Sequence, residues 1–124
     1  MIICWDLDGT LLKDKGVDYD TYCEFTPLMK LLRNQARPED IDICVTGRTV
    51  LPPLLEGYFD EIYLRDWEPS TWEHYYSEYF VWKCETIYSL KPDLVFEDDQ
   101  QICRWLTKHG VSCVWVPEYA YMHD

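Results

Sequence analysis

The first twelve residues join a buried-strand pattern to two carboxylates, and this combination restricts the folds open to the chain. The apolar run from Met1 to Trp5 predicts a short buried strand. It ends at Asp6, with Asp8 two residues later and Gly9 next. Two carboxylates at the end of a buried strand are costly unless a cation neutralises them; an acidic surface turn is the simpler alternative. Because glycine lets the backbone turn sharply beside a ligand, the stretch favours an oxygen-ligand site for a hard cation such as Mg2+.

The length and the distribution of apolar residues predict one soluble domain. The chain has 124 residues, enough for a single domain over residues 1–124 and too few for two. No apolar run approaches the roughly 18 residues that a membrane-spanning helix needs. Because the chain begins directly in the strand that precedes Asp6, we expect no removable secretory leader.

The cysteines and the net charge limit the cellular setting and the binding partners that we expect for this chain. None of the six cysteines forms a Cys-x-x-Cys pair, so a zinc site is poorly supported. Cys4, Cys44 and Cys113 lie in predicted strands, where a thiol acts as a small hydrophobic group, and we expect a reducing, cytoplasmic setting. The formal net charge of -12 repels nucleic-acid phosphates and anionic membranes. This charge argues against binding along a duplex, but not against binding one terminal phosphate.

Short apolar runs alternate with helical patterns along the rest of the chain. After the first strand and an irregular loop over 13–24, strands are predicted over 41–45, 62–64, 94–96 and 111–116. Four helices are predicted. The first has Thr26 as its N-cap and begins at Pro27, and a short second one covers 50–56. The third starts at the capping-box pattern Ser70 to Glu73 or nearer Tyr79 and ends at Lys91, and the fourth has Asp99 as its N-cap and ends at Gly110. Continuous apolar strands between helices predict a parallel sheet buried on both faces. The predicted fold class is therefore α/β, a three-layer α/β/α, Rossmann-like parallel sheet of about five strands.

Polar residues directly follow three of the predicted strands. Asp6 and Asp8 follow the first, Thr46 follows the second, and Glu97 with Asp98 ends the fourth. In open parallel sheets ligands bind beyond the carboxyl ends of the strands. We therefore expect these groups, which are far apart in the sequence, to meet at one site.

With these residues assembled, the chain resembles the phosphatases of the haloacid dehalogenase superfamily. The stretches that carry the resemblance are Asp6-Leu7-Asp8-Gly9-Thr10, the strand end Ile43-Cys44-Val45-Thr46-Gly47-Arg48, Lys83 on the helix before the fourth strand, and the acidic pair Glu97-Asp98. They occur in the family's order and span nearly the whole chain. The first and last are specific motifs, the second is moderately so, and a single lysine is weak.

The resemblance implies a Mg2+-dependent phosphomonoesterase that forms an aspartyl phosphate. Asp6 is then the nucleophile, and Asp8 protonates the leaving oxygen and later activates water. Asp6, the backbone carbonyl of Asp8 and Asp98 then hold Mg2+, which masks the negative charge of the phosphate. The other implied roles are phosphate binding by Thr46 and Lys83, an outer carboxylate at Glu97, and contacts to substrate or to these residues from Gly47 and Arg48.

Simpler interpretations stand beside several of these assignments. Thr46 is equally a candidate helix N-cap, and Arg48 a candidate partner in a structural ion pair. Lys83 is a surface lysine if Lys91 or Arg65 supplies the positive charge instead. These alternatives are left to the structure.

A narrower likeness concerns the substrate. The segment 94–116 is similar to the end of the phosphatase domain of bacteriophage polynucleotide kinase–phosphatases, which remove 3′ phosphates from nucleic-acid ends. The chain has no phosphate-loop motif of a kinase. The short intervals over 10–26 and 48–83 predict a capless or nearly capless enzyme with an open site. The expected partner is a phosphorylated small molecule or a nucleic-acid end, with no membrane; the oligomeric state is not predicted.

Two further alternatives concern the aromatic residues and the function itself. The stretch 58–88 is dense in aromatic side chains, which either fill the core or form a stacking platform beside the site, with Trp67 and Trp72 the candidates for stacking. The functions that compete with a phosphatase are a regulatory phosphoacceptor domain and a non-catalytic, partner-binding domain. Asp8 counts against a phosphoacceptor, because such domains lack an acid two residues after the nucleophile.

Overall fold

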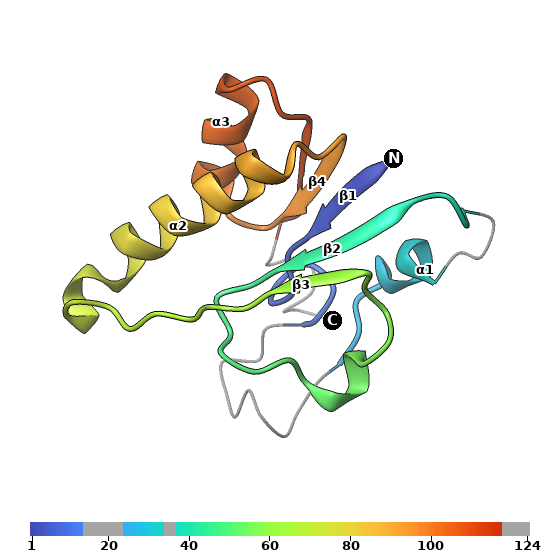
Figure 1. The fold of residues 1–124 in the computed structure, drawn as a ribbon, viewed down its shortest axis with the longest axis horizontal. Coiled ribbons are helices and arrows are strands. Elements are labelled where there is room, and N and C mark those ends of the chain that lie inside the picture. Colours follow the sequence, from blue (N-terminus) through green and yellow to red (C-terminus); the bar gives the residue numbers. More distant parts are fainter. Residues whose placement is uncertain (14–23, 34–36, 118–124) are drawn as a thin grey trace.

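The computed structural model describes residues 1–13, 24–33 and 37–117. Figure 1 shows a sheet with helices on either side of it. The elements are β1 (Ile2–Trp5), α1 (Met29–Leu32), β2 (Ile41–Val45), the 3-10 turn η1 (Pro53–Leu55), β3 (Glu61–Tyr63), the 3-10 turn η2 (Trp72–His74), α2 (Tyr75–Leu90), β4 (Leu94–Glu97), α3 (Gln100–Lys108) and β5 (Cys113–Trp115). The predicted loop over 13–24 lies mostly outside the described residues.

The five strands form one parallel sheet in the order β3-β2-β1-β4-β5. The first strand is central, and Cys4 lies opposite Ile43 on one side and Val95 on the other. The chain therefore builds the sheet outward from β1 in both directions. The predicted α/β class, with a parallel sheet of about five strands, is confirmed.

Each face of the sheet has its own apolar core. Alternate side chains of the central strands point to opposite faces, so Trp5 and Phe96 stack on one face with ring centroids 4.5 Å apart. That core includes Met29 of α1 and Leu55 of η1. The other core joins the central strands to α2 and α3, and its members include Ile87 and Leu106. Two cores on one sheet give the predicted three layers.

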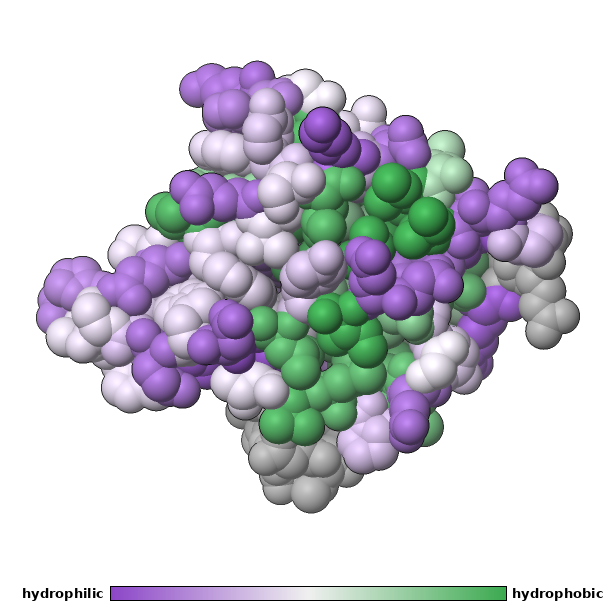
Figure 2. Space-filling view, in the orientation of Figure 1, coloured by the Kyte–Doolittle hydropathy of each residue, from purple (hydrophilic) through white to green (hydrophobic). Residues whose placement is uncertain are grey.

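The edge strands are more exposed than expected from the prediction that the sheet is buried on both faces. All of β3 is exposed, and Val114 and Trp115 of β5 are exposed as well. An edge strand has a neighbour on one side only. Although α3 contacts β5 as well as β4, the buried strand residues of the second core all come from β1, β2 and β4. Figure 2 shows hydrophobic residues in the middle of one face, where β2 and β3 lie in Figure 1. In a parallel sheet this small, the apolar pattern therefore identified strands correctly but overestimated the burial of the outer two.

The first helix does not begin as predicted. Leu28 occupies the N-cap position without a side-chain hydrogen bond, and α1 spans four residues. Thr26 is buried and donates its hydroxyl hydrogen to the carbonyl of Thr10, while its N–H donates to the carbonyl of Leu11. Thr26 therefore fastens the returning chain to the turn after β1, and the predicted N-cap is wrong.

The long helix begins near the predicted capping box, but one residue further along. Thr71 caps η2 by accepting a hydrogen bond from the His74 N–H at 3.2 Å, and Ser70 donates instead to Glu78. The alternative start near Tyr79 is wrong, since α2 begins at Tyr75. The predicted end is confirmed, with Lys91 in the left-handed conformation at φ 51°.

The remaining boundaries lie within a few residues of the predictions. The short helix expected over 50–56 is the single turn η1, and the third strand begins at Glu61 rather than Ile62. Asp99 caps α3 as predicted, because its carboxylate accepts from the N–H groups of Gln101 and Ile102. Gly110 follows the end of α3 with φ +83°, the left-handed conformation typical of a helix end.

No domain is inserted between β3 and α2. The residues between Leu64 and Thr71 are all described, and they run directly into η2. The interval between β1 and α1 includes residues outside the described part, so the capless prediction is met only for the later interval. Within the described ranges, no helix combines the length and the apolar character that a bilayer crossing requires.

Candidate functional site

The turn after β1 places two carboxylates at the carboxyl edge of the sheet. The Asp6 N–H donates to the carbonyl of Phe96, which continues the pairing of β1 with β4. The chain then turns sharply, and the carbonyl of Leu7 accepts from three N–H groups, those of residues 10, 11 and 12. Gly9 permits this turn with φ +84°, and a Cβ there would lie 2.2 Å from Oδ2 of Asp98. A glycine is therefore required both by the backbone conformation and by the approach of Asp98.

Lys83 and Asp6 form a buried ion pair at the base of the site. The Lys83 ammonium lies 2.5 Å from Oδ1 of Asp6, and both residues are buried. Thr10 donates its hydroxyl hydrogen to Oδ2 of Asp6 at 3.0 Å, and Lys83 also donates to the Tyr79 hydroxyl at 2.9 Å. Burial alone would raise the pKa of Asp6, but the Lys83 charge and hydrogen bonds hold that pKa below its ordinary value. Asp6 is thus kept as a carboxylate, and the interpretations of Asp6 as part of a surface turn and of Lys83 as a surface lysine are wrong.

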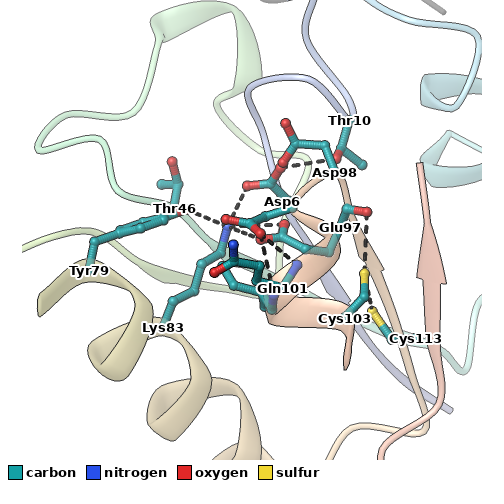
Figure 3. A network of polar contacts seen from close by, with 12 residues as sticks. Asp6, Thr10, Thr46, Tyr79, Lys83, Glu97, Asp98, Gln101, Cys103 and Cys113 are labelled. Carbon is teal, nitrogen blue, oxygen red and sulfur yellow. Dashed lines mark hydrogen bonds and ion pairs between the residues drawn. The ribbon is translucent and has the colours of Figure 1, made fainter. Parts of the chain in front are cut away.

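Glu97 and Asp98 bring two more carboxyl groups to the same place (Figure 3). One ligand oxygen from each of Asp6, Glu97 and Asp98 lies within 4.8 Å of the others. Glu97 is fully buried, and its Oε1 lies 3.0 Å from the Lys83 ammonium. Burial and the charge of Asp6 raise the pKa of Glu97 well above its ordinary value and raise the pKa of Asp98 to about 11. One ammonium is therefore shared by three carboxyl groups and is too little positive charge to keep all three ionised, so without a metal Glu97 and Asp98 favour their protonated, neutral forms.

This cluster has the composition of a site for a hard cation. Carboxylate oxygens are the ligands that Mg2+ and Ca2+ prefer, and a divalent cation would supply the missing positive charge. Asp6 and Asp98 were both predicted as ligands. The side chain of Asp8 lies outside the cluster, which agrees with a role through its backbone carbonyl, whereas Glu97 lies inside it rather than in an outer position.

Thr46 and Gly47 directly follow β2 at the rim of the site. Thr46 is buried, and its hydroxyl oxygen accepts from the Arg48 N–H at 3.2 Å. The first helical turn after β2 has Pro52 as its N-cap, so the alternative that Thr46 caps a helix is wrong. A Cβ on Gly47 would lie 2.8 Å from a ring carbon of Tyr79 and 3.0 Å from the hydroxyl oxygen of Tyr75. The glycine therefore lets two tyrosines of α2 close over the end of β2.

Arg48 fixes the second carboxylate of the opening motif. Its Nε and Nη2 lie 3.0 and 2.8 Å from the two carboxylate oxygens of Asp8. Such a two-point pair orients a carboxylate as well as attracting it. The ion pair considered for Arg48 is thus present, and its partner is the residue that the family resemblance makes the acid and base.

A cavity of about 730 Å³ opens over these groups. Six of the eight predicted site residues line it, namely Asp6, Asp8, Thr46, Gly47, Arg48 and Asp98, while Lys83 and Glu97 lie buried below. The structure thus gathers all eight at one edge of the sheet.

Seven of the described lining residues were not among the predicted site residues, although Trp72 was a candidate for stacking; they are Thr49, Val50, Arg65, Trp72, Tyr75, Tyr79 and Asp99. The available signal was the four-residue spacing of 75, 79 and 83, which places these side chains on one helix face. Lys91 lies at the far end of α2, and Arg65 donates to the carbonyl of Gly47, so neither replaces Lys83 beside Asp6.

No family model matches this chain, and no curated protein matches its sequence. The site must therefore be interpreted from its own geometry.

Proposed function

We propose that this protein is a Mg2+-dependent phosphomonoesterase that acts through a phosphorylated Asp6. The observation that carries the proposal is the Lys83–Asp6 pair beneath a cavity that Thr46 and Asp98 also line. A carboxylate nucleophile, a cation for the phosphoryl oxygens and a cluster of oxygen ligands are the parts that phosphoryl transfer to an aspartate requires.

The chain's own residues account for each bond that changes. Asp6 attacks phosphorus with a carboxylate oxygen, and the ester bond to the leaving oxygen breaks. Asp8 gives its proton to that oxygen. A water molecule then attacks phosphorus, Asp8 accepts the water's proton, and phosphate leaves as the Asp6 carboxylate is restored.

The remaining groups stabilise charge. Lys83 and Thr46 donate hydrogen bonds to the phosphoryl oxygens, and Arg48 holds Asp8 in position through two hydrogen bonds. Mg2+, held by Asp6, Asp98 and the Asp8 carbonyl or by Glu97, would lessen the negative charge that the nucleophile meets.

The proposed substrate is a phosphorylated small molecule or a nucleic-acid end, and the proposed setting is the cytoplasm. An open cavity accepts a phosphate at the end of a larger group, and the net charge of -12 disfavours a long polyanion. The 3′-phosphorylated nucleotides and ends suggested by the narrower family likeness are the first to test.

A regulatory phosphoacceptor or a non-catalytic scaffold is supported less well. An acceptor that must retain its phosphate has no use for a carboxylate that activates water, and Asp8 lines the cavity. A scaffold has no use for the crowding of three carboxyl groups, two of them buried, which costs stability.

The proposal is tested by hydrolysis of an aryl phosphate with Mg2+. We expect turnover that is lost on chelation and in Asp6→Asn, whereas Glu85→Gln, which changes an exposed carboxylate of α2 in the same way, keeps it. Circular dichroism checks that each variant is folded. The enzyme assignment fails if the wild type turns over no faster than folded Asp6→Asn.

A further inference from the structure

One wall of the cavity is aromatic. Trp72 of η2 and Tyr75 and Tyr79 of α2 all line it. Tyr75 stacks on Tyr79 with centroids 5.7 Å apart and ring planes at 16°, and Trp72 lies 5.7 Å from Tyr75 at 45°. The three rings thus form a continuous row, here called the aromatic wall.

The aromatic wall leads to the phosphate end of the site. Tyr75, Tyr79 and Lys83 are spaced by four residues, so each lies slightly more than one turn, or about 6 Å, further along α2. Tyr79 accepts a hydrogen bond from the Lys83 ammonium, which contacts Asp6. The same helix face therefore carries the cation at the base of the cavity and the rings toward its mouth.

The inner part of the wall packs against residues from two other segments. Gly47 leaves room for Tyr75 and Tyr79 at the end of β2, as the contacts of its missing Cβ show. Arg65 lies 5.4 Å from the Tyr75 ring centroid and donates to the carbonyls of Gly47 and Trp67. Trp67 packs against Tyr75 and Trp82 and does not line the cavity. Of the two tryptophans singled out in the sequence, Trp67 supports the wall and Trp72 faces the cavity.

Trp72, the first ring of the aromatic wall along the chain, is largely exposed. It is 71% exposed, the most exposed of the large hydrophobic residues in the described ranges. A single exposed ring is ordinary, but this one extends a stacked row inside a cavity that also contains the proposed nucleophile. An aromatic side chain in this position can stack on a planar ring of a ligand, as nucleobases stack on aromatic side chains in proteins that bind single strands.

We propose that the aromatic wall binds the base of a nucleotide whose phosphate lies on Lys83 and Asp6, and that Trp72 and Tyr75 select this substrate class. The inference rests on the proposed phosphatase function. The acidic surface favours a mononucleotide or the last nucleotide of a strand over a long strand. A sugar phosphate without a base lacks the group that the aromatic wall would contact.

The test compares substrates that differ only in the base. With Mg2+ present, kcat/KM is measured for a nucleoside 3′-phosphate and for the same sugar 3-phosphate without a base, and likewise for the 5′ pair. We expect the better base-bearing member to exceed its partner by about tenfold or more, and Trp72→Ala to remove most of this preference, as stacking energies of bases on aromatic rings imply. Trp72→Phe should keep part of it. Tyr88→Ala, which removes an exposed ring elsewhere on α2, should leave it unchanged.

A binding arm separates this inference from the proposed function. In Asp6→Asn, calorimetry measures the binding of each ligand without hydrolysis, and we expect the base-bearing ligand to bind more tightly unless Trp72 is replaced by alanine. Phosphate release in the wild type with equal kcat/KM for both members of each pair would overturn the aromatic-wall inference and leave the phosphatase intact. Tighter binding of the base-bearing ligand without any hydrolysis in the wild type would support the aromatic-wall inference and overturn the phosphatase function. A phosphotyrosine peptide that is hydrolysed better than either nucleotide would overturn the assignment to nucleotides.

Discussion

The ammonium of Lys83 lies 2.5 Å from a carboxylate oxygen of Asp6, although 77 positions separate them in the sequence. One residue ends the central strand, and the other lies in the middle of α2, which crosses the same face of the sheet. Both residues are buried, so each charge depends on the other for its stability. Lys83 therefore has a structural role in addition to its proposed role in catalysis.

Replacing Lys83 should show this dependence. Lys83→Met keeps most of the apolar stem but leaves the Asp6 charge without its partner, and we expect a loss of about 3–5 kcal/mol in the free energy of unfolding. Lys30→Met, at an exposed lysine, should change it by less than about 0.5 kcal/mol. Urea denaturation measures both.

A double variant separates the charge effect from packing. Adding Asp6→Asn to Lys83→Met removes the unpaired charge, so part of the lost stability should return. A double variant as unstable as the sum of the two single variants would mean that packing, not charge pairing, dominates.

Among the glycines that the structure describes with positive φ, Gly9 should be the most sensitive to substitution. In Gly9→Ala the new Cβ meets Asp98 at 2.2 Å in a backbone conformation with φ +84°. Gly57→Ala has a similar φ of +86° but open space around its Cβ, so it measures the backbone strain alone, about 1–2 kcal/mol. We expect Gly9→Ala to destabilise the protein by more than Gly57→Ala, and to weaken Mg2+ binding because Asp98 must move.

Calorimetric Mg2+ titration and thermal unfolding of the two variants provide the check. If Gly9→Ala and Gly57→Ala lose equal stability and both bind Mg2+ like the wild type, then the close approach of Asp98 to Gly9 has no consequence.

The sequence was sufficient to predict that most of the site residues lie close together, because these residues lie at or just after the ends of strands. The apolar runs before Asp6, Thr46 and Glu97 identify three strands, and parallel strands bring their carboxyl ends to one edge. Lys83 was found only through the family resemblance, since nothing local distinguishes a buried helix lysine from an exposed one. Its burial depends on Asp6 and Glu97, which are distant in the sequence.

The errors have a common physical origin. Thr26 has the residue type of an N-cap, but a tertiary hydrogen bond to the carbonyl of Thr10 uses its hydroxyl instead. Tyr75 and Tyr79 were recognised as part of an aromatic-rich stretch, yet their place in the cavity depends on Gly47, in the distant turn that follows β2. In each case a contact between distant segments, rather than a local preference, decides the outcome.

Arg48 should control how well Asp8 acts as acid and base. Arg48→Lys keeps a positive charge but loses the two-point geometry of the Nε and Nη2 contacts, and Arg48→Ala loses both. If Arg48 positions Asp8, kcat should fall by about tenfold or more in Arg48→Lys and further in Arg48→Ala, with a smaller change in KM. The pH profile of kcat should shift in the alanine variant, because the charge beside Asp8 is gone.

Steady-state kinetics over a pH series measure these effects on the aryl phosphate. A rise in KM with unchanged kcat and an unchanged pH profile would instead identify Arg48 as a residue that only binds substrate.

Asp98 should lower the stability of the protein without metal, although it is a proposed ligand of the metal. Burial and the Asp6 charge raise its pKa from 3.8 to about 11. Between these values the folded state holds a proton that the unfolded state releases, so the stability contributed by Asp98 falls as the pH rises above about 4. Asp98→Asn removes this loss, and we expect its melting temperature in EDTA to exceed that of the wild type by a margin that grows from about pH 5 to pH 8.

Mg2+ should raise the melting temperature of the wild type but not of Asp98→Asn, and Asp66→Asn, at an exposed aspartate, should behave like the wild type in both conditions. Thermal unfolding in EDTA and in Mg2+ decides the matter: equal Mg2+ shifts in the wild type and Asp98→Asn would place the cation elsewhere.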